Sequence, residues 1–240
     1  MLPDARRAAL REALLDAWAL VAPVQCAGCG ADDRSLCVSC RGALAGGLIV
    51  TRVGWVHVYS ALNYRTVVSH VLLSFKQHGR TDVASALAAP LARALDAAVK
   101  HAPSTPGAGA LELALVPTSA AAWRRRGYDP VRLVARRAGF RPRRVLVAAR
   151  SGAAQKTLTR EERAVNLDGA FIARGDLTGR RFVIVDDILT SGATMSEAAR
   201  ALRAAGGEVV AGATIAFTPR FAPNRDNAPI EDYGGAKGAR

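Results

Sequence analysis

The segment that most constrains the fold is RFVIVDDILTSGAT, from Arg181 to Thr194. Its unbroken apolar run, residues 182–185, predicts a strand buried on both faces, because a strand with one face in water would alternate apolar and polar residues. Asp186 and Asp187 then lead into a loop of small residues, after which apolar residues recur at helical spacing: Met195, Ala198, Ala199 and Leu202. This pattern predicts a strand, loop and helix with a binding site beyond the carboxyl end of the strand.

Apolar runs and helical patterns alternate along much of the chain. We expect strands over 55–64, 111–117, 143–149, 170–173 and 208–217. Helices are expected over 67–79, 81–101 and 120–139, with Leu87, Leu91 and Leu95 forming one apolar stripe in the second of them. Such alternation predicts an α/β fold: a mainly parallel sheet with helices on both faces.

Four parts are expected from these patterns. An amphipathic helix spans 1–22, a Cys/Gly-rich segment 23–47, the α/β domain 48–218, and a disordered Pro/Gly-rich tail 219–240. No stretch approaches the about 20 consecutive apolar residues of a membrane helix. The N-terminal helix carries Asp4, Glu12 and Asp16, unlike a secretion signal. We therefore expect a cytoplasmic protein that does not insert into a membrane.

The cysteines all lie in one segment, CAGCGADDRSLCVSC. They form two C-x-x-C pairs, Cys26 with Cys29 and Cys37 with Cys40. Two such turns can supply the four thiolates of a tetrahedral zinc site, and the glycines at 28 and 30 suit a tight turn. Two disulfides fit a reducing cytoplasm poorly, and a redox dithiol would explain only one pair. The spacing favours structural zinc.

The formal net charge of +13 and the sequence pI near 10.7 favour polyanionic partners. These could be nucleic acid, an anionic membrane surface or phosphorylated metabolites. Nearly all the cations are arginines spread along the chain, which a high-GC coding bias would also produce. Charge alone therefore does not choose the partner.

The acid pair and its loop together fit a ribose 5-phosphate. Two carboxylates can accept hydrogen bonds from vicinal hydroxyls, while free N–H groups at the helix start can hold a phosphate. An ATPase metal-binding strand would need a G-x-x-x-x-G-K-[ST] loop, which the chain lacks. A receiver domain would need another acid on a second strand. A purely structural alternative makes Thr194 a helix cap with Glu197 in a capping box.

At these residues the sequence resembles a known fingerprint. VIVDDILTSGAT is similar to the phosphoribosyl diphosphate (PRPP) motif of type I phosphoribosyltransferases. The order of a four-cysteine knuckle, YRTVVSHVLLSFKQHGR, VPTSAAAWRRRGYDP, QKTLTREERAVNLDGAF and the fingerprint resembles the ComF family of competence-related proteins, up to about residue 217. The resemblance implies a type I phosphoribosyltransferase fold preceded by a small four-cysteine zinc knuckle.

The resemblance also implies roles for individual residues. Asp186 and Asp187 would contact the ribose hydroxyls and act in catalysis, and the loop after an early strand would bind diphosphate. A lid over 155–166 would close the site, with Lys156 as a further catalytic candidate beside Arg160 and Arg163. The residues expected around the 5-phosphate are Thr190, Ser191, Gly192, Ala193 and Thr194, and those expected around diphosphate are Pro117, Thr118 and Ser119.

Two classes of function fit the resemblance. The first is an enzyme that transfers phosphoribosyl from PRPP, with Mg²⁺, to an acceptor and releases diphosphate. The second is a module that keeps the PRPP pocket but acts in DNA uptake or processing, through single-stranded DNA or a helicase partner. The sequence departs from the commoner family pattern at 128–130, where Tyr-Asp-Pro replaces an aromatic followed by Asn-Gln, and at Ser191, where Thr is frequent.

Overall fold

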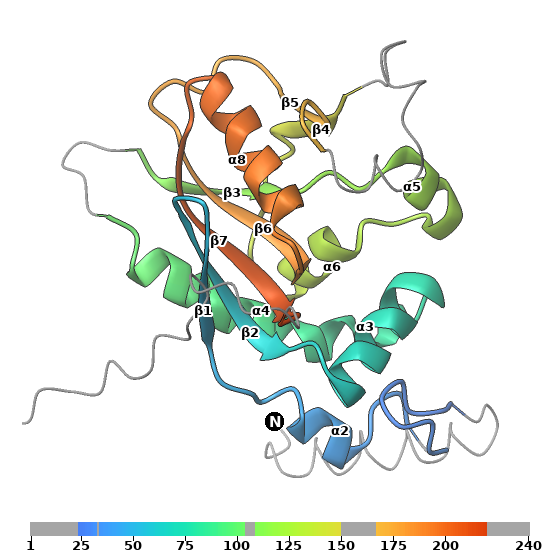
Figure 1. Cartoon of the computed structure of the whole chain (residues 1–240). Coiled ribbons are helices and arrows are strands. Elements are labelled where there is room, and N and C mark those ends of the chain that lie inside the picture. Colours follow the sequence, from blue (N-terminus) through green and yellow to red (C-terminus); the bar gives the residue numbers. More distant parts are fainter. Residues whose placement is uncertain (1–23, 33, 104–108, 150–166, 220–240) are drawn as a thin grey trace, which may run out of the picture.

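The computed structural model describes residues 24–32, 34–103, 109–149 and 167–219 (Figure 1). The predicted helix over 1–22, the implied lid over 155–166 and, except for residue 219, the predicted tail over 219–240 lie outside these ranges. No helix in the described ranges is long and apolar enough to cross a membrane.

A five-stranded sheet forms the centre of the α/β domain. Its order is β1 (Ile49–Val53), β2 (Val56–Asn63), β7 (Glu208–Phe217), β6 (Arg181–Leu189) and β3 (Leu111–Leu115). The β2–β7, β7–β6 and β6–β3 pairs are parallel, and only the β1–β2 hairpin is antiparallel. The prediction of a mainly parallel sheet is confirmed.

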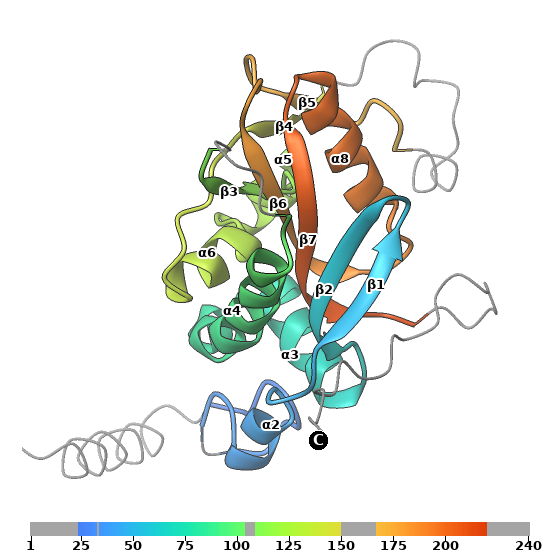
Figure 2. The same ribbon diagram turned by 90° about the vertical axis from the view of Figure 1, so that its left-hand side faces the viewer.

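Helices cover both faces of this sheet (Figures 1 and 2). One face packs against α3 (Thr66–Gln77), the short η1 (Thr81–Val83), α4 (Ala84–Lys100) and α6 (Pro130–Arg137). The predicted stripe of Leu87, Leu91 and Leu95 is fully buried there. The other face packs against α8 (Ala193–Ala204). Burial on both faces explains why the central strands are unbroken apolar runs.

The single helix predicted over 120–139 is wrong. The structure has α5 (Ala120–Arg126) and α6 instead, separated by Gly127 in the left-handed region at a φ of 73°. Pro130 occupies the first turn of α6, where its missing N–H costs nothing. The helical pattern of the sequence continued across 127–129. Gly127 nevertheless ends α5, and Pro130 begins α6.

Two of the predicted strands do not join the parallel sheet. β4 (Leu146–Ala148) and β5 (Phe171–Ala173) pair antiparallel in a separate two-stranded sheet that packs against α8. Strand β1 was not predicted at all. It is an edge strand with no buried residue, so it carries no solid apolar run.

Candidate functional site

A cavity of about 370 Å³ opens where β3 and β6 end. These strands are parallel neighbours, with Leu115 opposite Val185, so the loops that follow them meet at one edge of the sheet. The cavity lining includes seven of the residues predicted for the site: Pro117, Thr118, Ser119, Asp186, Asp187, Thr190 and Thr194. Ser191, Gly192 and Ala193 shape the loop between Thr190 and Thr194 without lining the cavity.

The sequence suggested that the two acids lie at the end of the strand. In the structure they lie within β6. The strand continues to Leu189 because β7 extends beside it and pairs with these last residues. The Asp187 N–H donates to Asp186 Oδ1 at 2.8 Å, and Asp187 Oδ2 lies 2.9 Å from Lys76 Nζ. Burial, reinforced by the charge of Asp187, raises the pKa of Asp186 to about 8.

The loop after the acids leads directly into α8. Gly192 is the N-cap residue at a φ of 79°, and Ser191 Oγ accepts a hydrogen bond from the Ala193 N–H at 3.2 Å. The capping-box alternative is therefore wrong. Glu197 instead accepts the Phe171 N–H at 3.0 Å and pairs with Arg200, which ties α8 to β5. The N–H groups that follow Ala193 in the first turn of α8 are left for a ligand held by the loop.

Gly192 is expected to tolerate no side chain. A Cβ there would lie 2.8 Å from Val53 Cγ1, and the positive φ adds strain. Gly192→Ala should lower the free energy of unfolding by about 2 kcal/mol or more, measured by urea denaturation. Gly175→Ala is the matched control, because its φ is 73° but its Cβ would meet nothing. Equal costs at the two positions would show that the contact with Val53 is irrelevant.

Two basic residues, Lys76 and Arg126, complete the cavity, and neither was assigned to the site from the sequence. Lys76, at the end of α3, neutralises Asp187. Arg126, at the end of α5, donates through Nη1 to the Lys76 carbonyl at 3.3 Å, while its buried Nε has no partner in the described part of the chain. The only local signal was a cation at the end of each helix. Which cavity they face depends on tertiary packing.

The segment over 128–130, which departs from the pattern of the family that the sequence resembles, has structural contacts. The Tyr128 hydroxyl donates to the Phe75 carbonyl, and Asp129 Oδ1 caps α6 by accepting the Arg132 N–H at 3.0 Å. Ser119 caps α5 in the same way, accepting the Ala122 N–H at 3.2 Å. The cavity walls are thus held by helix caps. Lys156, the remaining catalytic candidate, lies outside the described residues.

The four cysteines converge on one point. Their Sγ atoms all lie within 4.8 Å of one another, and Cys29 and Cys37 are 3.8 Å apart. Tetrahedral zinc with Zn–S bonds of about 2.3 Å requires S–S separations of about 3.8 Å. The Cys37 and Cys40 N–H groups donate to Sγ of Cys26 and Cys37, as they would to thiolates. All four thiols are free, so the cluster fits a zinc ion and not two disulfides.

The cysteine segment is fastened to the helices that form the site. His70 Nδ1 lies 2.9 Å from the Gly28 carbonyl, and Ser74 Oγ donates to the Ala27 carbonyl. Arg80 donates to the Gln25 carbonyl at 2.9 Å. His70 and Ser74 belong to α3, the helix that presents Lys76 to the acid pair. The cysteine segment therefore supports one wall of the cavity.

Comparison with known proteins agrees with this architecture. The family profile described as "Phosphoribosyl transferase domain" matches residues 124–232. Over 40 residues, 17% of this chain, the sequence is 52% identical to adenine phosphoribosyltransferases of Mycobacterium avium (strain 104) and Mycolicibacterium paratuberculosis (strain ATCC BAA-968 / K-10). The chain covers 22% of the length of each of these curated relatives. The predicted α/β fold class is confirmed.

Proposed function

We propose that the phosphoribosyl transferase domain present in this chain binds PRPP in the cavity between β3 and β6. The acid pair accepts hydrogen bonds from the two ribose hydroxyls, and the loop over 190–194 holds the 5-phosphate. Lys76, Arg126 and the Pro117–Ser119 loop receive the diphosphate. The observation that carries this proposal is the meeting of both half-sites, carboxylates and phosphate loop, in one cavity with two cations.

We further propose that the bound PRPP is a phosphoribosyl donor. An acceptor nitrogen forms a bond to C1 of the ribose while the bond from C1 to the diphosphate oxygen breaks, and the electron pair leaves with diphosphate. The charge of Asp186 and Asp187 favours the positive charge that develops on the ribose. Mg²⁺ bound together with PRPP would supply positive charge opposite the diphosphate. A zinc ion held by Cys26, Cys29, Cys37 and Cys40 would be structural and take no part in the chemistry.

Release of diphosphate tests the enzymatic proposal. The full chain is incubated with Mg·PRPP and each of a panel of nucleobases and other nitrogen heterocycles, including adenine, on which the relatives are named to act. Acceptor-dependent diphosphate supports transfer. Saturable PRPP binding without diphosphate release for any acceptor would favour a non-catalytic module of the ComF type in the cytoplasm.

The raised pKa of Asp186 predicts proton release when PRPP binds. At pH 7 a carboxyl with a pKa of about 8 is mostly protonated, whereas the proposed charge-assisted hydrogen bond from a ribose hydroxyl requires its ionised form. Affinity should therefore rise with pH up to about 8 and then level off. Calorimetric titrations at pH 7 in buffers of different ionisation enthalpy should show close to one proton released. Asp186→Asn should release none, and a wild-type protein that releases none would contradict this account.

A second candidate function is binding of single-stranded DNA. The ring of Trp123 on α5 is 43% exposed and has the Arg144 guanidinium 5.8 Å from its centroid, an arrangement on which a base could stack. Affinity for an oligonucleotide should then fall steeply with salt, and Trp123→Ala should weaken it. A helicase partner would be sought only if such binding is found. No affinity at low salt removes this candidate.

A further inference from the structure

A second cavity, of about 400 Å³, adjoins the proposed PRPP site. The two cavities share Val116, Pro117 and Thr118, so the loop after β3 forms a common wall. No role given above to PRPP requires this second cavity. Its position beside the ribose and diphosphate sites makes it a candidate for the acceptor.

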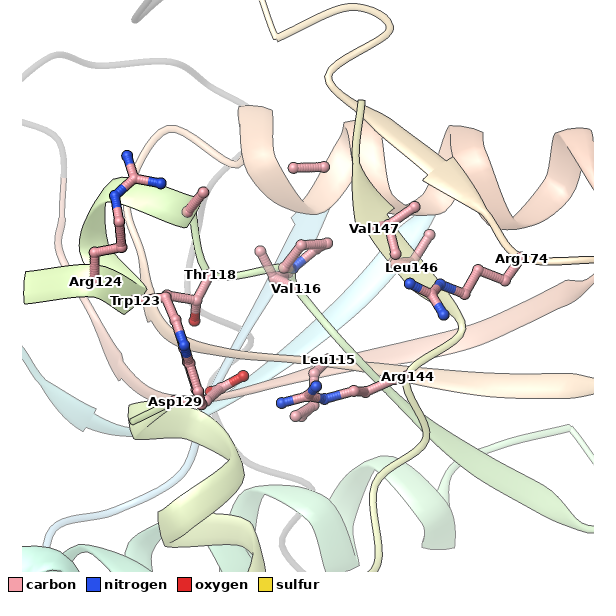
Figure 3. A pocket seen from close by; sticks show the side chains of 13 residues that line it. Leu115, Val116, Thr118, Trp123, Arg124, Asp129, Arg144, Leu146, Val147 and Arg174 are labelled. Carbon is pink, nitrogen blue, oxygen red and sulfur yellow. The ribbon is translucent and has the colours of Figure 1, made fainter. Parts of the chain in front are cut away.

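The walls of the second cavity are mostly apolar (Figure 3). Leu115 comes from β3, and Leu146 and Val147 come from β4. Trp123 contributes an indole from α5. Apolar walls with one aromatic side chain are suited to a planar ring, because such a ring buries its faces without leaving polar groups unpaired.

Arginines provide the charge of this cavity. Arg124, Arg144 and Arg174 line it, and none of them forms an ion pair with another residue in the described ranges. In Figure 3 the Arg144 side chain extends toward Asp129, whereas Arg124 points away from the other labelled side chains. Burial and the nearby charges of Arg144 and Arg136 hold the pKa of Arg132 below its usual range. The region therefore has a surplus of positive charge that an anion would relieve.

Asp129 is the only acid that lines the cavity in the described part of the chain. One of its oxygens, Oδ1, caps α6, which leaves Oδ2 available. After burial and the charge of Asp187, the charge of Asp129 also raises the pKa of Asp186. The next two residues, Pro130 and Val131, line the first cavity, so Asp129 lies where the two cavities adjoin. The second cavity thus combines one acceptor of an N–H with several arginine cations.

We propose that the second cavity binds the acceptor, and that the acceptor is a planar nitrogen heterocycle carrying a carboxylate. This inference rests on the proposed phosphoribosyl transfer. Arg144 and Arg174 bind the carboxylate, and Asp129 accepts the ring N–H. In the transfer the ring proton passes to the Asp129 carboxylate, the nitrogen electron pair forms the bond to C1, and the pair of the broken C1–O bond leaves on diphosphate.

Matched pairs of small rings test this assignment on the full chain. Orotate is compared with uracil, and both carry the ring N–H that Asp129 is proposed to accept. Nicotinate is compared with nicotinamide, whose ring nitrogen carries no proton, so this pair tests the carboxylate contact alone. Binding is measured by calorimetry and ligand-detected NMR, with adenine as a neutral purine. The carboxylated member of at least one pair should bind about tenfold more tightly or better, as expected for a charge-assisted pair. Inorganic phosphate should compete only weakly, because it lacks the ring.

Variants assign the discrimination to residues. The Arg144→Gln/Arg174→Gln double variant should bring the affinities of the two members of the pair to within about threefold. The carboxylate of the ligand then loses its two arginine partners, and a solvated charge without a close partner contributes little to affinity. Arg143→Gln is the matched control: its neighbour in sequence is Arg144, but Arg143 pairs with Glu112 and does not line the cavity. It should leave the discrimination unchanged.

Four results would overturn the inference. They are equal or tighter binding of the neutral rings, discrimination that survives the double variant, no binding of any ring, and competition by phosphate as strong as that of orotate, which would show a general anion site. Mg·PRPP is titrated into the same preparations. If PRPP binds and the rings fail, only the acceptor assignment is lost, whereas a failure of PRPP itself contradicts the proposed function.

Discussion

The Asp186→Ala/Asp187→Ala double variant will bind Mg·PRPP at least about a hundredfold more weakly than the wild-type protein. Each carboxylate is proposed to accept a charge-assisted hydrogen bond from a ribose hydroxyl, worth about 1.5–3 kcal/mol, so the loss of two such bonds exceeds a factor of about a hundred. Isothermal titration calorimetry measures the change directly. The variant should remain folded. Burial disfavours the ionised form of the Asp186 carboxyl in the free protein, so its removal takes away no stabilising charge.

A matched control separates ligand contacts from local charge. Asp82→Ala removes an exposed acid that pairs with Arg80 and lies outside the cavity. It should bind PRPP as the wild type does. Equal heats from the wild type and the Asp186→Ala/Asp187→Ala variant would contradict the assignment of the ribose hydroxyls to this pair.

Loss of zinc is expected to have the largest effect on stability. Structural zinc sites of four thiolates contribute about 10–16 kcal/mol of binding free energy, and a segment of this size folds only when metal is bound. Cys40→Ser, or treatment with a chelator, should therefore expose residues 24–47 to proteases and lower the melting temperature. Because α3 carries both the contacts to this segment and Lys76, the affinity for PRPP should also fall.

Elemental analysis and limited proteolysis measure these effects. The purified wild-type chain should contain one zinc per molecule, and Cys40→Ser should contain much less. Ser39→Ala, an exposed neighbour in α2 (Val38–Gly42), is the control and should keep its metal. A wild-type protein that contains no zinc and yet resists proteolysis within this segment would contradict the structural role of the metal.

The central unit of the fold could be predicted because its signals are local. The apolar run of β6, the small residues of its loop and the helical spacing of α8 lie next to one another in the sequence, and burial on both faces leaves a plain pattern. The cysteine cluster could be predicted equally well, because the spacing of the ligands along the chain indicates which turns can hold a metal.

The missing parts depend on contacts between distant segments. Lys76 belongs to the site because α3 ends beside β6, which no periodicity in α3 could indicate. The departure of β4 and β5 from the main sheet depends on their packing against α8, where Glu197 holds the Phe171 N–H. In the sequence, Asp129 was only a departure from the pattern of the family that the chain resembles. In the fold it caps α6 and lines the second cavity.

A crystal structure of the full chain with Mg·PRPP tests the central claim most directly. We predict that the 5-phosphate lies against the loop of residues 190–194, at the start of α8, and that the ribose hydroxyls lie within hydrogen-bond distance of Asp186 and Asp187. Diphosphate should contact Lys76 or Arg126. A ligand bound elsewhere, or one whose phosphate and ribose do not contact the loop and the acid pair, would contradict the account.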